Sequence, residues 1–314
     1  MIGALTACVA YLVDIAAATV SDWKLGHCST NPFLTREACC ASATSASEPV
    51  TECAEFKTWN NKYTAAFAIY VAFALLFGLI SASVTMFTKS ELPSAGAADA
   101  EDKDGTAQPA GKTMYMAAGS GIPEIKTILG GFVIPNFLSL KVLVVKAIGA
   151  VFAVSTGKND SSLSAPLILI EITTSTLRLL TCIGVIGMCL GKEGPFVHIS
   201  TCVGYLVASL FPKYRDNGRK MREMLSAACA AGLSVAFGAP IGGVLFSYEE
   251  ISTYFPRKVL WRAFLCSAVA AMVLKELNPT GTGKLVLFET NYGTSYGAVH
   301  YLVFVVLGEL RFQR

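Results

Sequence analysis

The sequence predicts an all-α membrane protein, a bundle of tilted and re-entrant helices. Only 15% of the 314 residues are charged and 53% are hydrophobic, whereas soluble domains carry about 25% charged residues. Residues 64–87 run for 24 positions without a charge, and a helix needs about 20 apolar residues to cross a bilayer. After residue 118 the apolar segments are short and interrupted by glycine and proline. Non-helical backbone within a membrane requires burial in protein or contact with water.

Two long spans are expected first, over residues 1–20 and 64–87. The first is apolar apart from Asp14 and has no basic leading region, so we expect no secretory signal peptide. The basic stretch 213–222 is expected in the cytosol by the positive-inside rule, although an ordinary solvated turn would also contain these residues. Further candidate spans are residues 137–154, 224–248, 258–274 and 297–308, of which 224–248 is broken by Pro240 and several glycines.

Two polar stretches separate these spans. The loop 21–62 joins the first two, so it lies on the side opposite residue 88, which we interpret as the lumen. It contains Cys28, Cys39, Cys40 and Cys53, which lack the spacing of a metal site. One or two disulfides are an open alternative there, with the pairing undetermined. The Ala/Gly/Pro-rich stretch 88–118 is expected to be a flexible cytosolic loop. Its GTAQPAGKT has five residues between the glycines where a phosphate loop needs four, so we discount it.

The first motif is GSGIPE at residues 119–124. Glycines permit unusual backbone angles, and Pro123 suits the first turn of a helix, so a helix is expected to start near Ile122. A helix N-terminus carries about half a positive charge together with free amides, and it therefore attracts anions. Ser120 adds a hydroxyl donor. The alternative is that Ser120 is a plain N-cap serine.

The second motif is GKEGPF at residues 191–196. Gly194 and Pro195 are expected to open another helix, over residues 195–211, with Glu193 just before its N-terminus. A carboxylate at that position can occupy the anion site and leave when it is protonated or displaced by a halide. Ionisable groups inside membranes are costly and usually functional. The alternative is a surface glutamate that caps the helix.

The third motif is GAPIGGVLFSYEE at residues 238–250. Adjacent carboxylates at the end of an apolar helix are unusual, because the helix dipole disfavours negative charge there. We interpret Glu249 and Glu250 as a proton acceptor open to water, or alternatively as an interfacial pair where the helix leaves the membrane. His198 and His300 lack ligand spacing and are expected to be packing or interfacial residues.

Together and in this order, the three motifs resemble the CLC family of chloride channels and chloride/proton antiporters, especially its eukaryotic intracellular branch. The resemblance extends over residues 2–308, apart from 158–187 and the polar loop. It implies that Ser120 donates to the central chloride, that Glu193 is the gating glutamate and that Glu250 is the inner proton glutamate. The other chloride-site residues that it implies are Gly121, Ile122, Gly194 and Phe196, and the supporting motif residues are Gly119, Pro123, Glu124, Gly191, Lys192 and Pro195.

The resemblance implies chloride/proton antiport across an endosomal, Golgi or vacuolar membrane by a homodimer with one pore per subunit. Its expected partners are chloride, protons and membrane lipid, with no cofactor and no metal. The net charge of +3 is too small to indicate nucleic-acid binding. A non-transporting truncated fragment or dimerising partner subunit is the alternative. An enzyme is not expected, because the motifs supply no nucleophile, metal or cofactor site.

The resemblance also implies how the chain is organised. Residues 1–87 hold two spans, 88–118 a cytosolic loop, 119–308 the broken-helix chloride pathway and 309–314 an aberrant tail. The chain is thus expected to contain the first of two inverted halves of the CLC membrane bundle, without the second half or the nucleotide-sensing CBS domains.

Residues 158–187 interrupt the resemblance, and their removal would give the family-like stretch AVSTGMCLGKEGP. We hypothesise an intron read through in frame, because Gly157-Lys158 can be encoded by GGTAAG and Gly308-Glu309 by GGTGAG, each containing a splice-donor sequence. A genuine extra helix or loop is the alternative. Sequencing of reverse-transcribed messenger RNA should show the codons for 158–187 missing. Mature messages that retain these codons and encode a stable protein would defeat the hypothesis.

Overall fold

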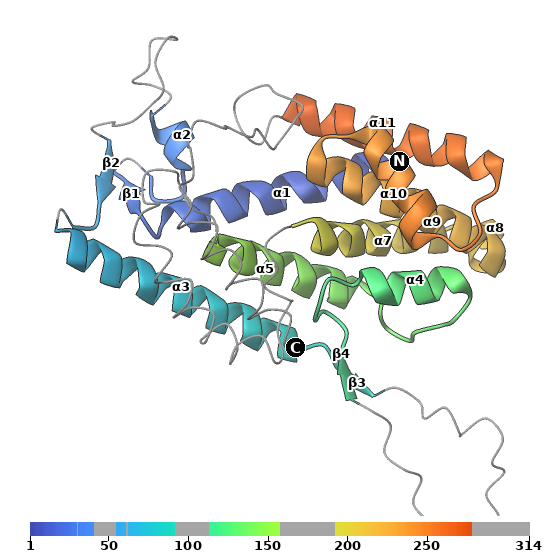
Figure 1. The fold of residues 1–314 in the computed structure, drawn as a ribbon, viewed down its shortest axis with the longest axis horizontal. Helices are drawn as coiled ribbons and strands as arrows, with labels where there is room; N and C mark the ends of the chain where they lie inside the picture. The colour runs from blue at the N-terminus through green and yellow to red at the C-terminus, as the bar shows by residue number, and fades with distance from the viewer. Residues whose placement is uncertain (30, 41–54, 61, 92–112, 158–191, 278–314) are drawn as a thin grey trace, which may run out of the picture.

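Figure 1 shows a computed structural model that describes residues 1–29, 31–40, 55–60, 62–91, 113–157 and 192–277. Helices dominate this part of the chain, as the sequence predicts. The predicted spans at 1–20, 64–87, 137–154 and 258–274 all fall on helices, although the third helix begins only at Leu140. The predicted span 297–308 lies outside the described residues. The longer helices are α1 (Ile2–Asp22), α3 (Tyr63–Met86), α5 (Leu140–Gly157), α7 (Glu193–Ser209), α9 (Gly218–Phe237) and α11 (Arg257–Leu277), and the shorter ones are α2 (Arg36–Cys40), α4 (Ile122–Gly130), α8 (Pro212–Arg215), α10 (Pro240–Phe246) and the π-helix η2 (Ser247–Ile251).

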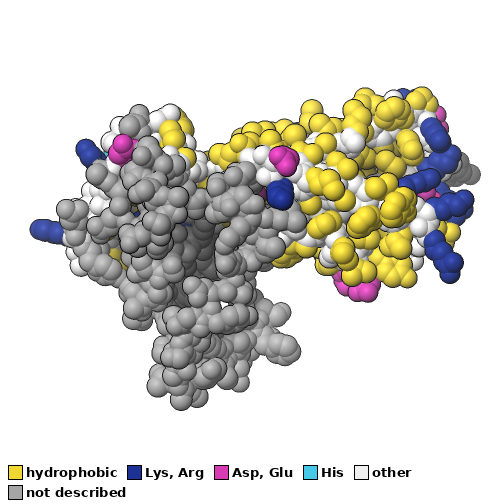
Figure 2. Space-filling model, turned by 90° about the horizontal axis from the view of Figure 1, so that it is seen from above, with side chains coloured by type: hydrophobic (Ala, Val, Ile, Leu, Met, Phe, Trp, Pro, Cys, Tyr) yellow, Lys and Arg dark blue, Asp and Glu magenta, His cyan; other side chains and the backbone are white. Residues whose placement is uncertain are grey.

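The outer helices present apolar side chains outward. Among the described residues, two helices are long and apolar enough to cross a membrane, Ile2–Asp22 and Thr64–Met86, with mean hydropathy of 1.8 and 2.3. Figure 2 shows hydrophobic side chains over much of the described surface. Such a surface is costly in water and suits lipid. Large exposed apolar side chains on α3, α5 and α11 include Leu76, Leu79, Leu140, Val144, Trp261, Leu265 and Met272.

Small residues let the inner helices α7 and α9 approach closely. A side chain at Gly204 would collide with Ala228, and one at Gly232 would collide with Ser200. Small residues at these contacts are the usual means by which membrane helices bring their backbones together. Residues 194–204 of α7 and 225–236 of α9 are consequently buried. This packing fixes the axis of α7, whose N-terminus carries the GKEGPF motif.

The predicted break at GAPIGG is present. Helix α9 ends at Phe237, Gly238 is left-handed with φ of 69°, and α10 begins at Pro240. Glycine just beyond the end of a helix and proline in the first turn of the next are the residues expected at such helix boundaries. The π-helix η2 continues from α10 and carries Glu249 and Glu250. Hydroxyl groups fasten η2 to α9, since Ser247 Oγ donates to the Ser226 carbonyl over 2.8 Å.

Four short strands were not predicted. Strand β1 (Gly26–Cys28) pairs antiparallel with β2 (Phe56–Thr58), and β3 (Lys89–Glu91) pairs antiparallel with β4 (Thr113–Tyr115). The interpretation of 21–62 and 88–118 simply as polar loops therefore missed that the ends of each stretch are paired. Three-residue strands are too short to show the alternating pattern that reveals a strand in a sequence.

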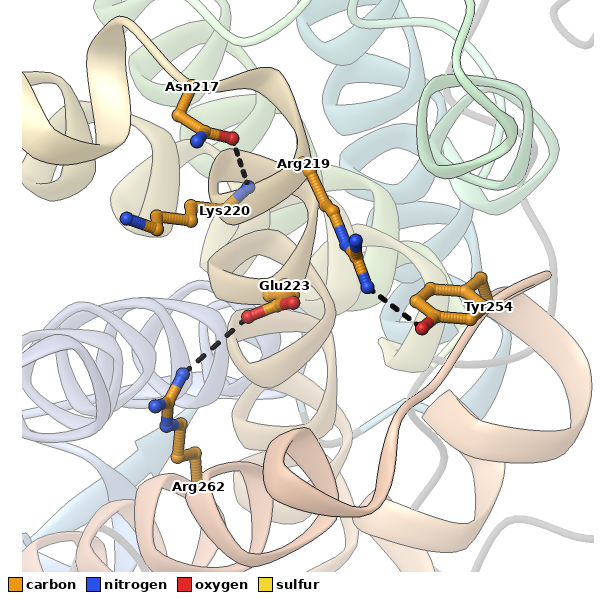
Figure 3. Close-up of polar contacts among 6 residues, drawn as sticks. All are labelled: Asn217, Arg219, Lys220, Glu223, Tyr254 and Arg262. Atoms are coloured by element: carbon orange, nitrogen blue, oxygen red, sulfur yellow. Dashed lines mark hydrogen bonds and ion pairs between the residues drawn. The ribbon is translucent and has the colours of Figure 1, made fainter.

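Basic side chains gather at one end of the molecule, around α8 and the starts of α9 and α11 (Figure 2). Figure 3 shows how they are held there. Asn217 Oδ1 caps α9 by accepting from the Lys220 amide over 3.2 Å. The Arg219 guanidinium donates to the Tyr254 hydroxyl over 2.9 Å, and Arg262 lies 3.6 Å from the Glu223 carboxylate. The other end of the long axis holds α2, β1 and β2 (Figure 1).

The structure resolves one pairing that the sequence left open. Cys28 of β1 forms a disulfide with Cys39 of α2, with 6.1 Å between their Cα atoms. Cys40 also takes part in a disulfide, while Cys8, Cys202, Cys229 and Cys266 are free. The disulfide links β1 to α2, within the stretch that follows α1.

We predict that this disulfide forms in the protein purified without reductant. Trypsin cuts after Lys24 and Arg36, so mass spectrometry should detect the peptide of Cys28 joined to the peptide of Cys39. Because the second peptide also contains Cys40 and Cys53, the Cys39→Ser variant should lose this linkage and the matched Cys40→Ser variant should keep it. A linkage that survives in Cys39→Ser would contradict the assignment. The opposite pattern, or full alkylation of Cys28 without reduction, would contradict the assignment.

Candidate functional site

The GSGIPE loop makes a tight entrance to α4. Gly119 and Gly121 have φ angles of 69° and 83°, a left-handed backbone that costs other residues about 1–2 kcal/mol. Gly121 is the N-cap of α4, and Pro123 lies in its first turn. The helix begins at Ile122, so its predicted start is confirmed. This geometry leaves Ser120 between two glycines, at the tip of the loop.

Ser120 is exposed, and its Oγ accepts a hydrogen bond from the Ile122 amide over 3.3 Å. The N-cap alternative misplaced the residue, because Gly121 occupies that position. A serine hydroxyl that accepts still has its hydrogen to donate. Ser120 can therefore offer an O–H donor beside the positive end of α4.

The GKEGPF motif opens α7, two residues earlier than predicted. The helix covers Glu193–Ser209 rather than 195–211 because Lys192 has a right-handed backbone and its carbonyl accepts from the Phe196 amide over 3.0 Å. Glu193 is thus the first helical residue rather than the one before the helix, and its side chain is half-buried. Pro195 and Phe196 are buried, whereas Gly191 lies outside the described residues.

The two helix starts meet. A Cβ added to Gly194 would lie 2.7 Å from the Ser120 Cβ, and one added to Gly121 would lie 2.7 Å from Nδ1 of His198. Figure 1 shows α4 beside α7, as this contact requires. His198 is fully buried, stacks on Phe137 with 4.2 Å between ring centroids, and its Nε2 lies 3.2 Å from the Phe137 carbonyl oxygen. The packing role expected for His198 is confirmed.

This meeting concentrates positive charge. Each helix N-terminus contributes about half a unit charge and amides without an intrahelical acceptor. A fully buried lysine lies behind the loop, where Lys146 Nζ donates to the Ala117 carbonyl over 2.9 Å and also to the Gly119 carbonyl. The ammonium group thereby holds the loop that carries Ser120. The sequence interpretation gave Lys146 no role, although an ionisable residue within a predicted span was the available signal.

Glu250 of η2 forms an ion pair with Lys126 of α4, one turn beyond the start of α4. Glu249 and Glu250 are both exposed, and Glu250 Oε1 lies 3.2 Å from Lys126 Nζ of α4. Lys126 is four residues beyond Ile122, which is roughly 6 Å along the helix axis. One short helix therefore carries the Ser120 loop at its start and contacts Glu250 about one turn later. Glu124, in the first turn of α4, is half-buried and directs one carboxylate oxygen into the protein.

The structure thus brings together Ser120, Gly121 and Gly194, with Glu193 at the head of α7, and places Glu250 apart from them. Lys192, a supporting motif residue, forms an ion pair with Asp14 of α1 over 2.8 Å. The sequence interpretation also gave Asp14 no role, although it is the one charge in the first predicted span.

Within the described residues, no group of three or more His, Cys, Asp or Glu side chains could hold a metal ion.

The chain is similar to known chloride channels and H(+)/Cl(-) exchange transporters. Residues 160–310 match the family described as voltage gated chloride channel. The chain is 38% identical over 323 residues to the H(+)/Cl(-) exchange transporter 5 of Rattus norvegicus, and 38% identical over 317 residues to the H(+)/Cl(-) exchange transporter 3 of Homo sapiens. Each match covers 98% of this chain and 32% of the relative, so the chain spans about a third of the length of these relatives.

The fold is also matched. The crystal structure of a eukaryotic CLC transporter aligns with 93% of this chain and 38% of its own, at 21% identity and a TM-score of 0.54. The sequence matches and the shared fold agree with the resemblance that the three motifs indicated. Over nearly its whole length, the chain is thus similar to the CLC family of chloride channels and chloride/proton exchangers.

Proposed function

We propose that the protein exchanges chloride for protons across an intracellular membrane, with residues 119–250 supplying part of the pathway. The observation that carries this proposal is the contact of Ser120 with Gly194, which brings the N-termini of α4 and α7 together. Helix N-termini are ready-made anion sites, and transporters commonly point such termini at anionic substrates. Chloride is an anion without hydrogen-bond donors of its own, so convergent amide and hydroxyl donors suit it.

In this proposal the chloride site consists of the Ser120 hydroxyl and backbone amides of the two helix starts. The residues that we assign to it are Ser120, Gly121, Ile122, Gly194 and Phe196. Lys146 adds positive charge from behind and keeps the loop in place through two backbone carbonyls. Chloride exchanges its hydration shell for these donors, which stay fixed because the glycines, His198 and Lys146 hold the loop.

Glu193 supplies the coupling. As the first residue of α7, its carboxylate is stabilised by the same helix end that attracts chloride. The carboxylate and chloride therefore compete for one positive site. Protonation removes the charge of the carboxylate, which weakens its hold and lets chloride enter. Because the binding of a proton to Glu193 favours its replacement by chloride, chloride movement is tied to proton movement.

Glu250 is the proton acceptor on the other side. It is exposed, so water can reach it, and the ammonium group of Lys126 lies within 3.2 Å of it. The names of the relatives, which are H(+)/Cl(-) exchange transporters, favour this exchange over passive conduction. Glu249, also exposed, is assigned no role in proton transfer.

The charge and the disulfide at the two ends of the molecule favour one orientation of the protein in the membrane. The basic end around α8 and the start of α9 suits the cytosol. The end with the Cys28–Cys39 disulfide suits an oxidising lumen. A homodimer in an endosomal, Golgi or vacuolar membrane fits the resemblance to the intracellular branch, and transport rather than catalysis is the activity we assign.

Glu193→Ala is expected to separate the two fluxes. With the full-length gene product in liposomes, a chloride gradient should drive proton movement in the unmodified protein. The variant should still conduct chloride but lose at least about 90% of the coupled proton flux, because no carboxylate remains to carry the proton. Glu223→Gln, at the basic end, is the matched control and should keep coupling. Proton flux that survives in Glu193→Ala would refute the role of Glu193.

Glu250→Ala should stop proton flux while some chloride conduction remains, because the proton then lacks its acceptor. Glu249→Ala, which changes the adjacent exposed carboxylate, is the matched control and should keep most of the proton flux. Lys126→Met should reduce proton flux less than Glu250→Ala, since exposed ion pairs contribute about 1 kcal/mol or less. Both fluxes can be recorded together with chloride and pH electrodes. A critical Glu249 and a dispensable Glu250 would contradict the assignment.

A further inference from the structure

The ion pair between Asp14 and Lys192 ties the first membrane helix to the residue before Glu193. Lys192 Nζ lies 2.8 Å from Asp14 Oδ1, and the two side chains are only 18% and 14% exposed. Each of the other three ion pairs described has at least one partner more than half exposed. Asp14 is also the only charge in residues 2–20. A charge in an apolar span is costly and usually functional.

The pair reaches the site through the backbone. Lys192 is the N-cap of α7, and its carbonyl accepts the first hydrogen bond of that helix from the Phe196 amide. Its ammonium group lies 5.4 Å from the centroid of the Phe196 ring. Two residues later, Gly194 contacts Ser120. A side chain that holds Lys192 therefore holds the first turn of α7 against the Ser120 loop.

Charge gives the pair a second effect. Lys192 is adjacent to Glu193 and close to the positive start of α7. If its charge were uncompensated in this partly buried place, its ammonium group would attract both the Glu193 carboxylate and chloride. The Asp14 carboxylate cancels that charge at short range, where little water screens it.

We propose that Asp14 is a positioning residue for the Glu193 gate, and this inference rests on the proposed exchange. Through Lys192 it fixes the start of α7, and by neutralising Lys192 it leaves the Glu193 carboxylate to compete with chloride alone. Asp14 touches neither ion in this account. It is contributed by α1, an element that carries none of the three motifs.

The test is a double-mutant cycle in liposomes with the full-length gene product. Asp14→Asn should lower the rate of coupled exchange about tenfold, because a small misplacement near a site is costly in rate. The chloride concentration for half-maximal transport should also fall, about threefold, because Lys192 attracts the anion more strongly once the Asp14 carboxylate beside it is neutral. A variant that merely loosened the fold would not gain apparent affinity for chloride.

The second pair of variants separates charge from structure. Asp14→Glu should stay within about threefold of the unmodified rate. The double variant Asp14→Asn with Lys192→Met should recover most of the lost rate, since removing both charges leaves neither uncompensated. Glu223→Gln, which breaks the Glu223–Arg262 ion pair at the basic end, is the matched control and should change nothing.

Two outcomes overturn the inference: unchanged rate and chloride dependence in Asp14→Asn, or a double variant no faster than Asp14→Asn. Amounts of folded protein, measured by size-exclusion chromatography, normalise every rate. If Asp14→Asn yields no folded protein, the transport rate of the double variant is compared with that of Lys192→Met alone. A double variant that transports more slowly than Lys192→Met, or that also fails to fold, likewise overturns the inference. If the unmodified protein moves chloride without protons, the proposed exchange function is wrong. The chloride transport rates of the same variants still test whether the Asp14–Lys192 ion pair positions the start of α7.

Discussion

The close contact between the Ser120 loop and the first turn of α7 is the constraint on which the rest of the structure depends. Two helix N-termini repel each other electrostatically, so they meet only when the surrounding structure holds them. Glycine at 194 and at 121 makes the approach possible, because a Cβ at either position would collide with Ser120 or His198. An anion between the termini removes the repulsion, which is why this geometry selects a negatively charged ligand.

Several features of the fold serve this contact. Behind α7, the small residues of α9 allow a close approach that fixes the helix axis. The buried Lys146 holds the backbone of residues 117–119, and Asp14 holds Lys192. Charges inside a membrane protein are stable only with partners. Lys146 and Asp14 each have such a partner, and through it each fixes one segment of backbone at the proposed chloride site.

The sequence predicted the features that are local in the chain. Pro123, Gly238 and Pro240 marked helix boundaries correctly because backbone preference at a single residue decides them. The start of α7 was misplaced by two residues, since the hydrogen bond of the Lys192 carbonyl leaves no signal in composition. The roles assigned to Ser120, Glu193 and Glu250 came from the resemblance and remain predictions.

What the sequence could not predict depends on distant pairing. Lys126 and Glu250 are 124 positions apart, and Lys192 and Asp14 are 178 apart. Neither pair has a local pattern, and the same holds for the paired strands β1 and β2. The hypothesis on residues 158–187 falls outside the described residues and stays open to transcript sequencing.

Anomalous X-ray diffraction from crystals grown in bromide tests the central claim most directly. Bromide has the charge of chloride and a similar size, and its absorption edge identifies it without ambiguity. The account predicts an anomalous peak within hydrogen-bonding reach of Ser120 Oγ and the first amides of α4 and α7, and its loss when Gly194 is replaced by a bulky residue such as leucine. A protein that transports chloride but shows bromide only elsewhere would contradict the assignment of this site.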